Sequence, residues 1–291
     1  SPSSAASDVY KRQYGDYLYI AGCLEVPGKN LDVLVMKMDL NGNIVWNITW
    51  GTEKDEIGVC IYVAEDYLYV AGCKEESTGT YCDVLILVID HGGEVLENYT
   101  WGNQGESEWA EDIYVYYQCA YIVGVISADG EHDGFLMKYD VEYGRLEWNV
   151  TYSGPEWDEL YAVLFDGYIY AVGYTERHLT GYGSYDALIL KYNDDGEFIG
   201  NLTWGTTSID ILKDIYRYNG KYYIVGSTHG YTEDWDTVIL VINSELEIEE
   251  YFVSRRPIGD RGIAIYVNDD GIYVAGSLSE WYFPSDMLLI K

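Results

Sequence analysis

Apolar and β-branched residues occur along the chain in runs of five to eight positions, separated by short clusters of Gly, Asp, Asn and Ser. Within a run, apolar residues either alternate with polar ones or follow each other directly, and the period of an amphipathic helix is absent. Residues 58–102 contain four such runs: GVCIYVA, YLYVAGC, VLILVID and EVLENYTWG. The pattern predicts an all-β protein built from short antiparallel strands.

Two sequence markers repeat with one period along the chain. A Tyr-x-x-Gly signature recurs every 49 to 53 residues, and an Asp that opens an apolar run recurs every 50 to 53 residues. Four strands in a unit of about fifty residues are typical of a propeller blade. The sequence therefore predicts a six-bladed β-propeller of four-stranded antiparallel blades. The markers are Gly22, Gly72, Gly124, Gly173, Gly226 and Gly276, and Asp32, Asp83, Asp133, Asp186, Asp236 and Asp286.

Both ends of the chain depart from the repeat. We interpret residues 1–13 as an atypical segment, either non-native or a genuine N-terminal arm, and residues 14–291 as a single propeller domain. Lys11, Arg12 and Gln13 stand where other units have apolar residues, so we expect the first blade to lack an inner strand. The predicted blades are residues 14–52, 53–103, 104–154, 155–205, 206–257 and 258–291.

The sixth unit stops after the run DMLLIK, so the last blade lacks an outer strand of its own. Truncation of the sequence, a three-stranded blade and a strand donated by another subunit all explain this. An unpaired edge strand is a template for pairing, and donation between subunits would build a polymer. We therefore expect self-association through the incomplete last blade.

The segments DVLVMKMDLNGNIVWNITWGTEKDE and DALILKYNDDGEFIGNLTWGTTSID show the repeat best: an Asp, an apolar strand, a Gly-containing turn, a Trp-Gly pair and an acidic link. This pattern resembles the SBBP-type bacterial and archaeal β-propeller repeat over residues 14–291. The resemblance implies a propeller of the kind found in exported and surface proteins, with no particular activity. Two departures are the blade count, which is seven in many members, and Val88 and Val241 in place of a third-strand Lys.

The acidic composition limits the classes of partner. The formal net charge is -32, so the chain would be repelled by nucleic acid and by anionic membrane surfaces. No run of 18 apolar residues occurs, and we expect no membrane insertion. The 32 Tyr and 9 Trp residues suit broad, half-buried sheets.

Asn-x-Thr sequons occupy the same register of the fourth strand in four units, where we expect glycans to have solvent room. The alternative is that one ancestral motif was copied without being modified. We predict N-glycosylation, and with it export to the cell surface or the extracellular space. The sequons begin at Asn47, Asn98, Asn149 and Asn201.

Five cysteines lie in the first half of the chain without zinc-knuckle spacing. Cys73 and Cys82 bracket a short loop and are a candidate disulfide, with two free buried thiols as the alternative. Cys23 occupies the repeat position of Cys73, which favours simple packing for both.

Acidic residues cluster in the links between units, where we expect turn capping and solvation. The repeated Asp of the third strand is expected to bind backbone amides. His132, His178 and His229 lie in loops without a matched repeat position, so a metal site there is a weak hypothesis. We identify no catalytic residue, and we expect no cofactor, because nucleophile, P-loop and dinucleotide motifs are absent.

Three function hypotheses follow, in order of preference. The first is a secreted, N-glycosylated structural or adhesive surface propeller that forms filaments by strand exchange. The second is a carbohydrate-binding module that uses the loop aromatics Trp109, Trp157, Trp235 and Trp281 as stacking platforms. The third is an enzyme that acts on polysaccharide through link carboxylates, although the sequence offers no privileged pair of acids.

Overall fold

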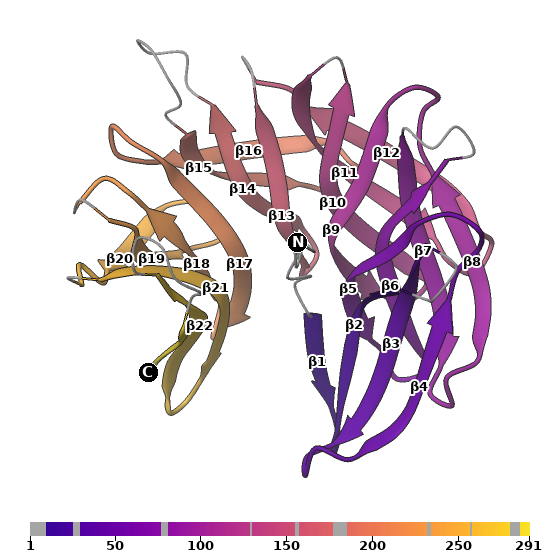
Figure 1. The fold of residues 1–291 in the computed structure, drawn as a ribbon. Coiled ribbons are helices and arrows are strands. Elements are labelled where there is room, and N and C mark those ends of the chain that lie inside the picture. Colours follow the sequence, from indigo (N-terminus) through magenta and orange to yellow (C-terminus); the bar gives the residue numbers. More distant parts are fainter. Residues whose placement is uncertain are drawn as a thin grey trace, which may run out of the picture. The chain divides into compact units, whose positions relative to one another are not determined.

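The computed structural model describes residues 10–25, 30–76, 81–128, 130–154, 157–176, 185–231, 234–256, 258–279 and 286–291. Within these ranges the chain forms 23 strands and no helix. The strands build six antiparallel sheets in which neighbours in sequence are neighbours in the sheet (Figure 1). The predicted all-β organisation in six units is confirmed. The chain divides into two compact units, residues 1–149 and 150–291.

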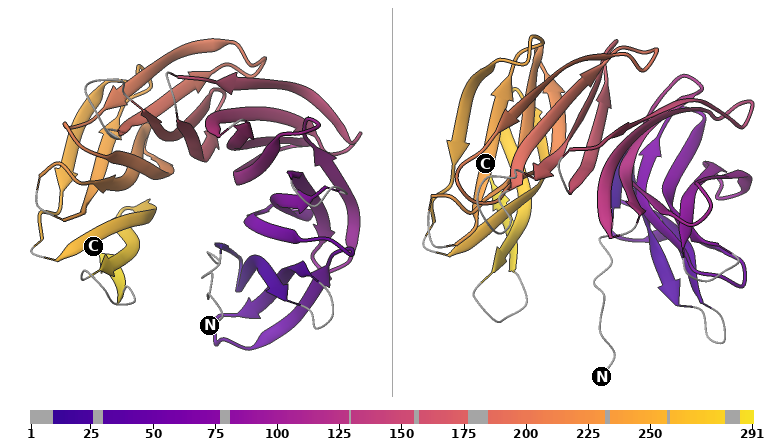
Figure 2. Two further views of the ribbon diagram at one scale, coloured as in Figure 1. Left: turned by 45° about the horizontal axis from the view of Figure 1, so that its top comes forward. Right: turned by 90° about the horizontal axis from the view of Figure 1, so that it is seen from above.

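The first unit holds three four-stranded sheets. We call the first strand of each sheet the inner strand and the fourth the outer strand; in this unit successive inner strands lie side by side (Figure 2). The strands are β1 (Tyr10–Tyr14), β2 (Tyr17–Glu25), β3 (Leu31–Asp39), β4 (Ile44–Trp50), β5 (Glu56–Val63), β6 (Tyr67–Glu75), β7 (Cys82–Asp90), β8 (Val95–Trp101), β9 (Ser107–Tyr116), β10 (Cys119–Ala128), β11 (Glu131–Asp140) and β12 (Arg145–Tyr152), the last of which crosses the unit boundary.

The second unit holds two four-stranded sheets and one three-stranded sheet. In the third of these, β23 pairs with β22 alone among the described residues. The strands are β13 (Asp158–Phe165), β14 (Ile169–Glu176), β15 (Tyr185–Tyr192), β16 (Phe198–Trp204), β17 (Asp210–Tyr218), β18 (Lys221–Thr228), β19 (Asp236–Ile242), β20 (Ile248–Val253), β21 (Gly259–Asn268), β22 (Gly271–Ser279) and β23 (Asp286–Ile290).

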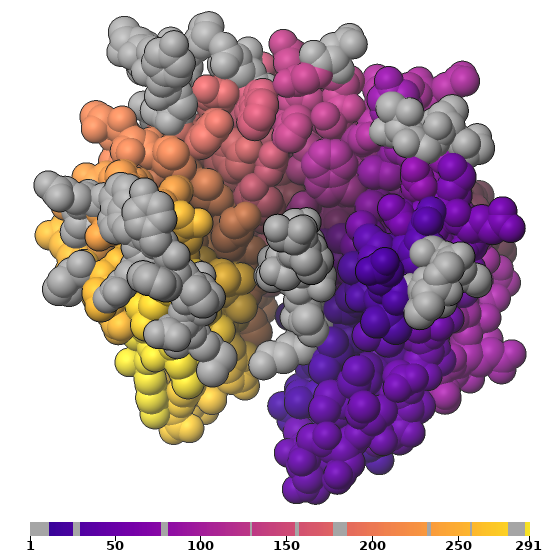
Figure 3. Space-filling model, viewed as in Figure 1, coloured from indigo at the N-terminus to yellow at the C-terminus, as the bar shows by residue number. Residues whose placement is uncertain are grey.

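The third strands form the most buried part of each sheet. In β7, every side chain from Val84 to Ile89 is buried, with Leu85 and Leu87 facing the first sheet and Ile86 facing the third. Burying each such aliphatic side chain contributes roughly 1.5–3 kcal/mol. Side chains thus fill the space between neighbouring sheets, and the three sheets form one continuous packed surface in the space-filling view (Figure 3).

A bulge in the inner strand explains the Tyr-x-x-Gly marker. The pairing of β5 with β6 shifts between Gly58 and Cys60, and a Cβ on Gly72 would lie 1.9 Å from the carbonyl oxygen of Ile57. The same close approach, at 1.8–2.0 Å, occurs at four further marker glycines: Gly124, Gly173, Gly226 and Gly276. At Gly22, a Cβ would meet no atom of the described residues within 4 Å, and β1 begins at Tyr10, opposite Ala21. The glycine is therefore a steric requirement of the bulge.

The expectation that the first blade lacks an inner strand is wrong. Residues 10–14, YKRQY, form β1 and pair with β2 over five residues. Pairing uses the backbone, so polar side chains permit it. Asp112 of β9 balances the charge of Arg12 through an ion pair of 3.9 Å. Residues 10–13 of the segment predicted to be atypical thus belong to β1, and residues 1–9 lie outside the described ranges.

Candidate functional site

The outer strands expose all four predicted sequons. Along β4, exposed and half-buried residues alternate, so that Asn47 and Thr49 are exposed while Trp46, Ile48 and Trp50 are half-buried. The half-buried face packs against the core between the first two sheets. The Asn and Thr of the other three sequons are exposed in the same way on β8, β12 and β16. The acceptor and its hydroxyl are thus accessible in each case, and glycosylation itself stays a prediction.

The fifth sheet departs from this pattern. Its outer strand, β20, carries Tyr251 and Val253 at the places of the sequon Asn and Thr. Tyr251 and Phe252 are each 50% exposed, and the Tyr251 ring lies 6.0 Å from the ring of Trp204. The outer strand of this sheet is therefore an aromatic surface without a glycan acceptor.

Cys73 and Cys82 lie near each other at the end of the β6–β7 hairpin. Both are free thiols in the structure, and a side-chain hydrogen bond joins them. This bond and burial raise the pKa of Cys73. The disulfide stays a prediction, because the two sulfur atoms meet without being bonded.

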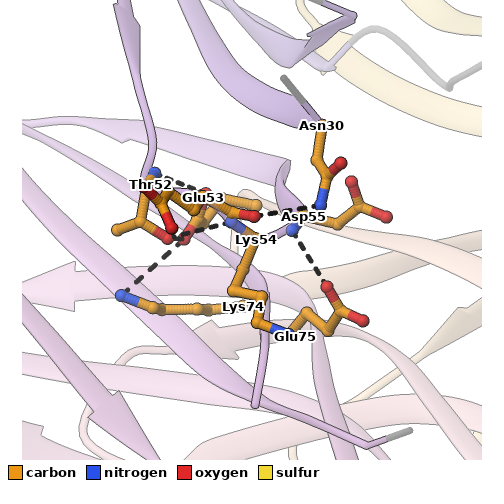
Figure 4. A network of polar contacts seen from close by, with 8 residues as sticks. Asn30, Thr52, Glu53, Lys54, Asp55, Lys74 and Glu75 are labelled. Carbon is orange, nitrogen blue, oxygen red and sulfur yellow. Dashed lines mark hydrogen bonds and ion pairs between the residues drawn. The ribbon is translucent and has the colours of Figure 1, made fainter. Parts of the chain in front are cut away.

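The link between β4 and β5 forms a polar network in which Thr52, Asp55 and Lys74 take part (Figure 4). Glu56 lies within it. The carboxylate accepts the backbone N–H of Thr52 at 2.8 Å and its hydroxyl at 2.5 Å. Lys74 Nζ lies 3.7 Å from Glu56 Oε1. Asp55 accepts the N–H of Leu31 at 2.8 Å and so ties the link to β3. A buried carboxylate surrounded by donors in this way fastens the link to the start of the inner strand.

The same arrangement recurs at the start of the later inner strands. Glu108 accepts the N–H of Asn103 at 2.8 Å, and Asp210 accepts that of Thr206 at 2.6 Å. Asp158 accepts the N–H of Gly154. The predicted turn capping is confirmed at these positions, whereas the predicted solvation is wrong. The side chains are fully buried, since backbone donors replace water: Glu56, Glu108, Asp158, Asp210 and Asp260.

The link between the second and third sheets brings two carboxyl groups together. A Cβ on Gly102 would lie 2.3 Å from Asp83 Oδ1 and 2.9 Å from Glu108 Oε2, so these oxygens are at most about 5 Å apart. Glu108 Oε2 is buried without a hydrogen-bond partner among the described residues. Burial raises the pKa of Glu108 to about 7, and the carboxylates of Glu106 and Asp83 add to the rise. Burial also raises the pKa of Asp83.

The third-strand aspartates do not behave uniformly. Asp32 is buried, but its Oδ1 has no hydrogen-bond partner within the described ranges, contrary to the expected amide contact. In the fifth sheet, the amide of Thr237 donates to Asp260 of the next inner strand at 2.8 Å. The link carboxylate of Asp260 therefore binds the backbone at the start of the third strand.

Two of the histidines singled out in the sequence form ring contacts with two of the tryptophans. The His132 ring is 5.8 Å from that of Trp109, and the His229 ring is 5.5 Å from that of Trp235. Trp157 is 39% exposed. His178 and Trp281 lie outside the described residues. Nowhere in the described ranges do three or more His, Cys, Asp or Glu side chains meet in a way that holds a metal ion.

Sequence reasoning missed an arginine–aromatic cluster on the fifth and sixth sheets, formed by Tyr231, Trp235, Arg255 and Arg261. The Arg255 guanidinium lies 4.7 Å from the centre of the Tyr231 ring, and that of Arg261 lies 4.2 Å from the Trp235 ring. Burial lowers the pKa of Arg261. The signal that could have found the cluster is the segment SRRPIGDR, the one arginine-rich link of an acidic chain.

Comparison with known proteins identifies the class of fold. The chain is similar to a sialidase of Trypanosoma rangeli (TM-score 0.59, 10% identity, 97% of this chain and 54% of that one). It is also similar to a periplasmic gluconolactonase of Pseudomonas aeruginosa (0.56, 11%, 97% and 88%). A third similar structure is the propeller domain of the Trilobed protease of Pyrococcus furiosus, described as having an open velcro topology (0.55, 8%, 97% and 82%). The chain spans about half the length of the sialidase.

These likenesses and the strand order define a six-bladed β-propeller of four-stranded antiparallel sheets, the last with three strands. No protein-family model and no curated protein matches the sequence, so the SBBP resemblance stays a prediction. The described part of the chain contains no helix that is both long and apolar enough to cross a lipid bilayer.

Proposed function

We propose that this propeller is a subunit of an extracellular or cell-surface structure, N-glycosylated on its outer strands and linked to further copies through the edge of β23. The observation that carries the proposal is the shared exposure of the four sequons. In each, the Asn and the Thr face solvent while the alternate residues pack inward. An acidic propeller that carries several glycans on its outer strands is suited to a crowded surface layer.

Among the described residues, β23 pairs on one edge only, with β22, and this supports the linkage between copies. A strand with unpaired N–H and C=O groups accepts another strand, and main-chain hydrogen bonds then supply affinity. Leu289 on β23 is 71% exposed, which gives an incoming strand an apolar contact. Two copies, each of net charge -32, repel each other. We therefore expect association to strengthen as salt screens this repulsion, with a screening length of about 10 Å at 0.1 M.

Glycosylation is tested by the intact mass of protein isolated from its natural source. The unmodified chain has a mass of 33.1 kDa, and each occupied sequon adds one glycan. Replacement of Thr49 and Thr100 by Ala should remove two of these increments and leave those of Asn149 and Asn201. An unmodified mass for the native material would rule out the glycoprotein assignment.

Self-association is tested with Leu289→Lys, a charge on the free edge that should block strand addition without affecting the fold. Leu40→Lys is the matched control, because Leu40 is 55% exposed in the turn between β3 and β4. In sedimentation and electron microscopy, the native chain and the control should form linear assemblies and Leu289→Lys should not. Isolated discs at every salt concentration would contradict the proposal.

A further inference from the structure

The arginine–aromatic cluster contains the two described arginines that no carboxylate neutralises. Within the described residues, Arg255 and Arg261 contact aromatic rings and form no ion pair. Each of the other four described arginines pairs with an aspartate: Arg12 with Asp112, Arg145 with Asp140, Arg217 with Asp166 and Arg256 with Asp260. In a chain with 49 Asp and Glu residues, two guanidinium groups that lack an acidic partner within the described ranges are a departure from the other arginines and are available to a ligand.

Backbone and side-chain contacts tie together the segments that carry the two arginines. Ser254 Oγ donates to Asp260 Oδ1 at 2.8 Å, and these two residues immediately precede Arg255 and Arg261. The amide of Asp260 donates to the carbonyl of Trp235 at 2.8 Å, which fixes the ring beside Arg261. The cluster is therefore positioned by a hydrogen-bonded framework rather than by surface side chains alone.

The backbone at Arg255 is itself unusual. Its φ is +48°, in the left-handed region that non-glycine residues rarely adopt. Arg255 occupies the place held by Gly205 after β16 and by Gly51 after β4. A long cationic side chain held in a conformation that favours glycine is the kind of local strain that accompanies binding sites.

We propose that the cluster is a binding site for a carboxylated saccharide, such as a uronic-acid oligomer. A guanidinium binds a carboxylate through two parallel hydrogen bonds, and stacking on an aromatic ring pre-orients it for this contact. Tyr231, which is 37% exposed, and the half-buried Trp235 offer an apolar ring with a polar tip, which suits the C–H face and hydroxyl rim of a sugar.

A saccharide fits the site better than the acidic surface of a second copy does. A second copy has a net charge of -32 and is repelled at long range, whereas a short uronate oligomer carries few charges. The proposal uses neither the free edge of β23 nor the sequons, so it stands or falls independently of the proposed assembly.

The test measures binding of tetragalacturonate to the full chain by calorimetry, with maltotetraose as the neutral probe of equal length. Arg255→Gly removes the guanidinium and suits a φ of +48°, so it should fold at least as well as the native chain. Arg261→Gln removes the second guanidinium group. Because a charged hydrogen bond contributes roughly 1.5–3 kcal/mol, each variant should bind about tenfold more weakly or worse.

Arg217→Gln is the matched control, since Arg217 is an exposed arginine already paired with Asp166 and should leave binding unchanged. Equal binding of maltotetraose, no binding of tetragalacturonate, or unchanged binding by the double variant would overturn the proposal. Loss of self-association instead of saccharide binding in the double variant would overturn it in favour of a second copy as the partner.

Discussion

The link that follows the outer strand is acidic after the first sheet and rich in arginine after the fifth. After β4, the link keeps its carboxylate within the protein, because Glu56 accepts two bonds from Thr52 and pairs with Lys74. After β20, Asp260 fastens the link in a similar way, yet Arg255 and Arg261 beside it are without an acidic partner among the described residues.

The link between an outer strand and the next inner strand serves two purposes, which are stabilising the fold and recognising a ligand. A buried carboxylate fixes the start of the inner strand in both links, so this contact belongs to the fold. The residues next to the carboxylate differ in charge without disturbing it, so they are the ones available for recognition. We therefore expect binding residues of this propeller next to the repeated link carboxylates, and we expect the carboxylates themselves to serve the fold.

The largest effect should come from Gly51→Ala in the acidic link. A Cβ at this position would lie 2.3 Å from Asp32 Oδ1 and 2.5 Å from its Cγ, and Asp32 is buried. We expect a loss of about 1–3 kcal/mol in the free energy of unfolding, measured by urea denaturation. Gly22→Ala is the control, because a Cβ there meets no atom within 4 Å in the part of the chain that the structure describes. Equal losses for both variants would show that the contact with Asp32 is not the cause.

The next effect separates two buried link carboxylates by their pH dependence. The pKa of Glu108 is raised in the folded state to about 7. Its contribution to stability is therefore complete below its ordinary pKa of about 4.3 and is lost as the pH rises through about 7. Glu108→Gln should stabilise the protein at pH 8 relative to the native chain and change little at pH 4, as followed by thermal unfolding.

Glu56→Gln should behave in the opposite way at pH 8. The variant weakens the bonds from Thr52 and leaves Lys74 without its carboxylate, so we expect a loss of roughly 1–3 kcal/mol. The two variants remove the same group from the same repeat position. Destabilisation by both variants at pH 8 would mean that burial and the neighbouring carboxylates do not raise the pKa of Glu108 in the folded protein.

The smallest effect concerns Arg255→Gly in the basic link. Glycine adopts a φ of +48° without steric cost, so the variant should gain about 1 kcal/mol or less in the free energy of unfolding. Gly205→Arg, which places arginine at the same position after β16, should be destabilising for a different reason, because a Cβ there would lie 2.4 Å from Asp186 Oδ1. A loss of stability in Arg255→Gly would show that the stacking of Arg255 on Tyr231 outweighs the backbone strain.

Much of the fold follows from residues that each unit repeats. The Tyr-x-x-Gly marker predicts the position of the second strand because the bulge beside it requires glycine, as the contact of Gly72 with the carbonyl of Ile57 demonstrates. The third strands are predictable because both of their faces are buried, so they are almost wholly apolar. Periodic features of this kind can be found by comparing the chain with itself.

The remaining features depend on partners that are distant in the sequence. Strand β1 is polar, and the aspartate that receives Arg12 is one hundred positions further along the chain. The burial of Glu56 could not be predicted from a polar turn sequence, since it depends on donors that only the folded link presents. The arginine–aromatic cluster needs Trp235 and Arg261 from different sheets, a pairing that no periodic pattern reveals.

The order of strands within each sheet has a consequence for how the chain acquires its structure. Every sheet is built from consecutive strands, and the hydrogen bonds within the links join residues only four to six apart, as Thr52 and Glu56, Asn103 and Glu108, or Ser254 and Asp260. Contacts this local close at a small entropic cost. Each sheet can therefore complete itself while the following one is still being synthesised, so that folding advances along the chain from one unit to the next.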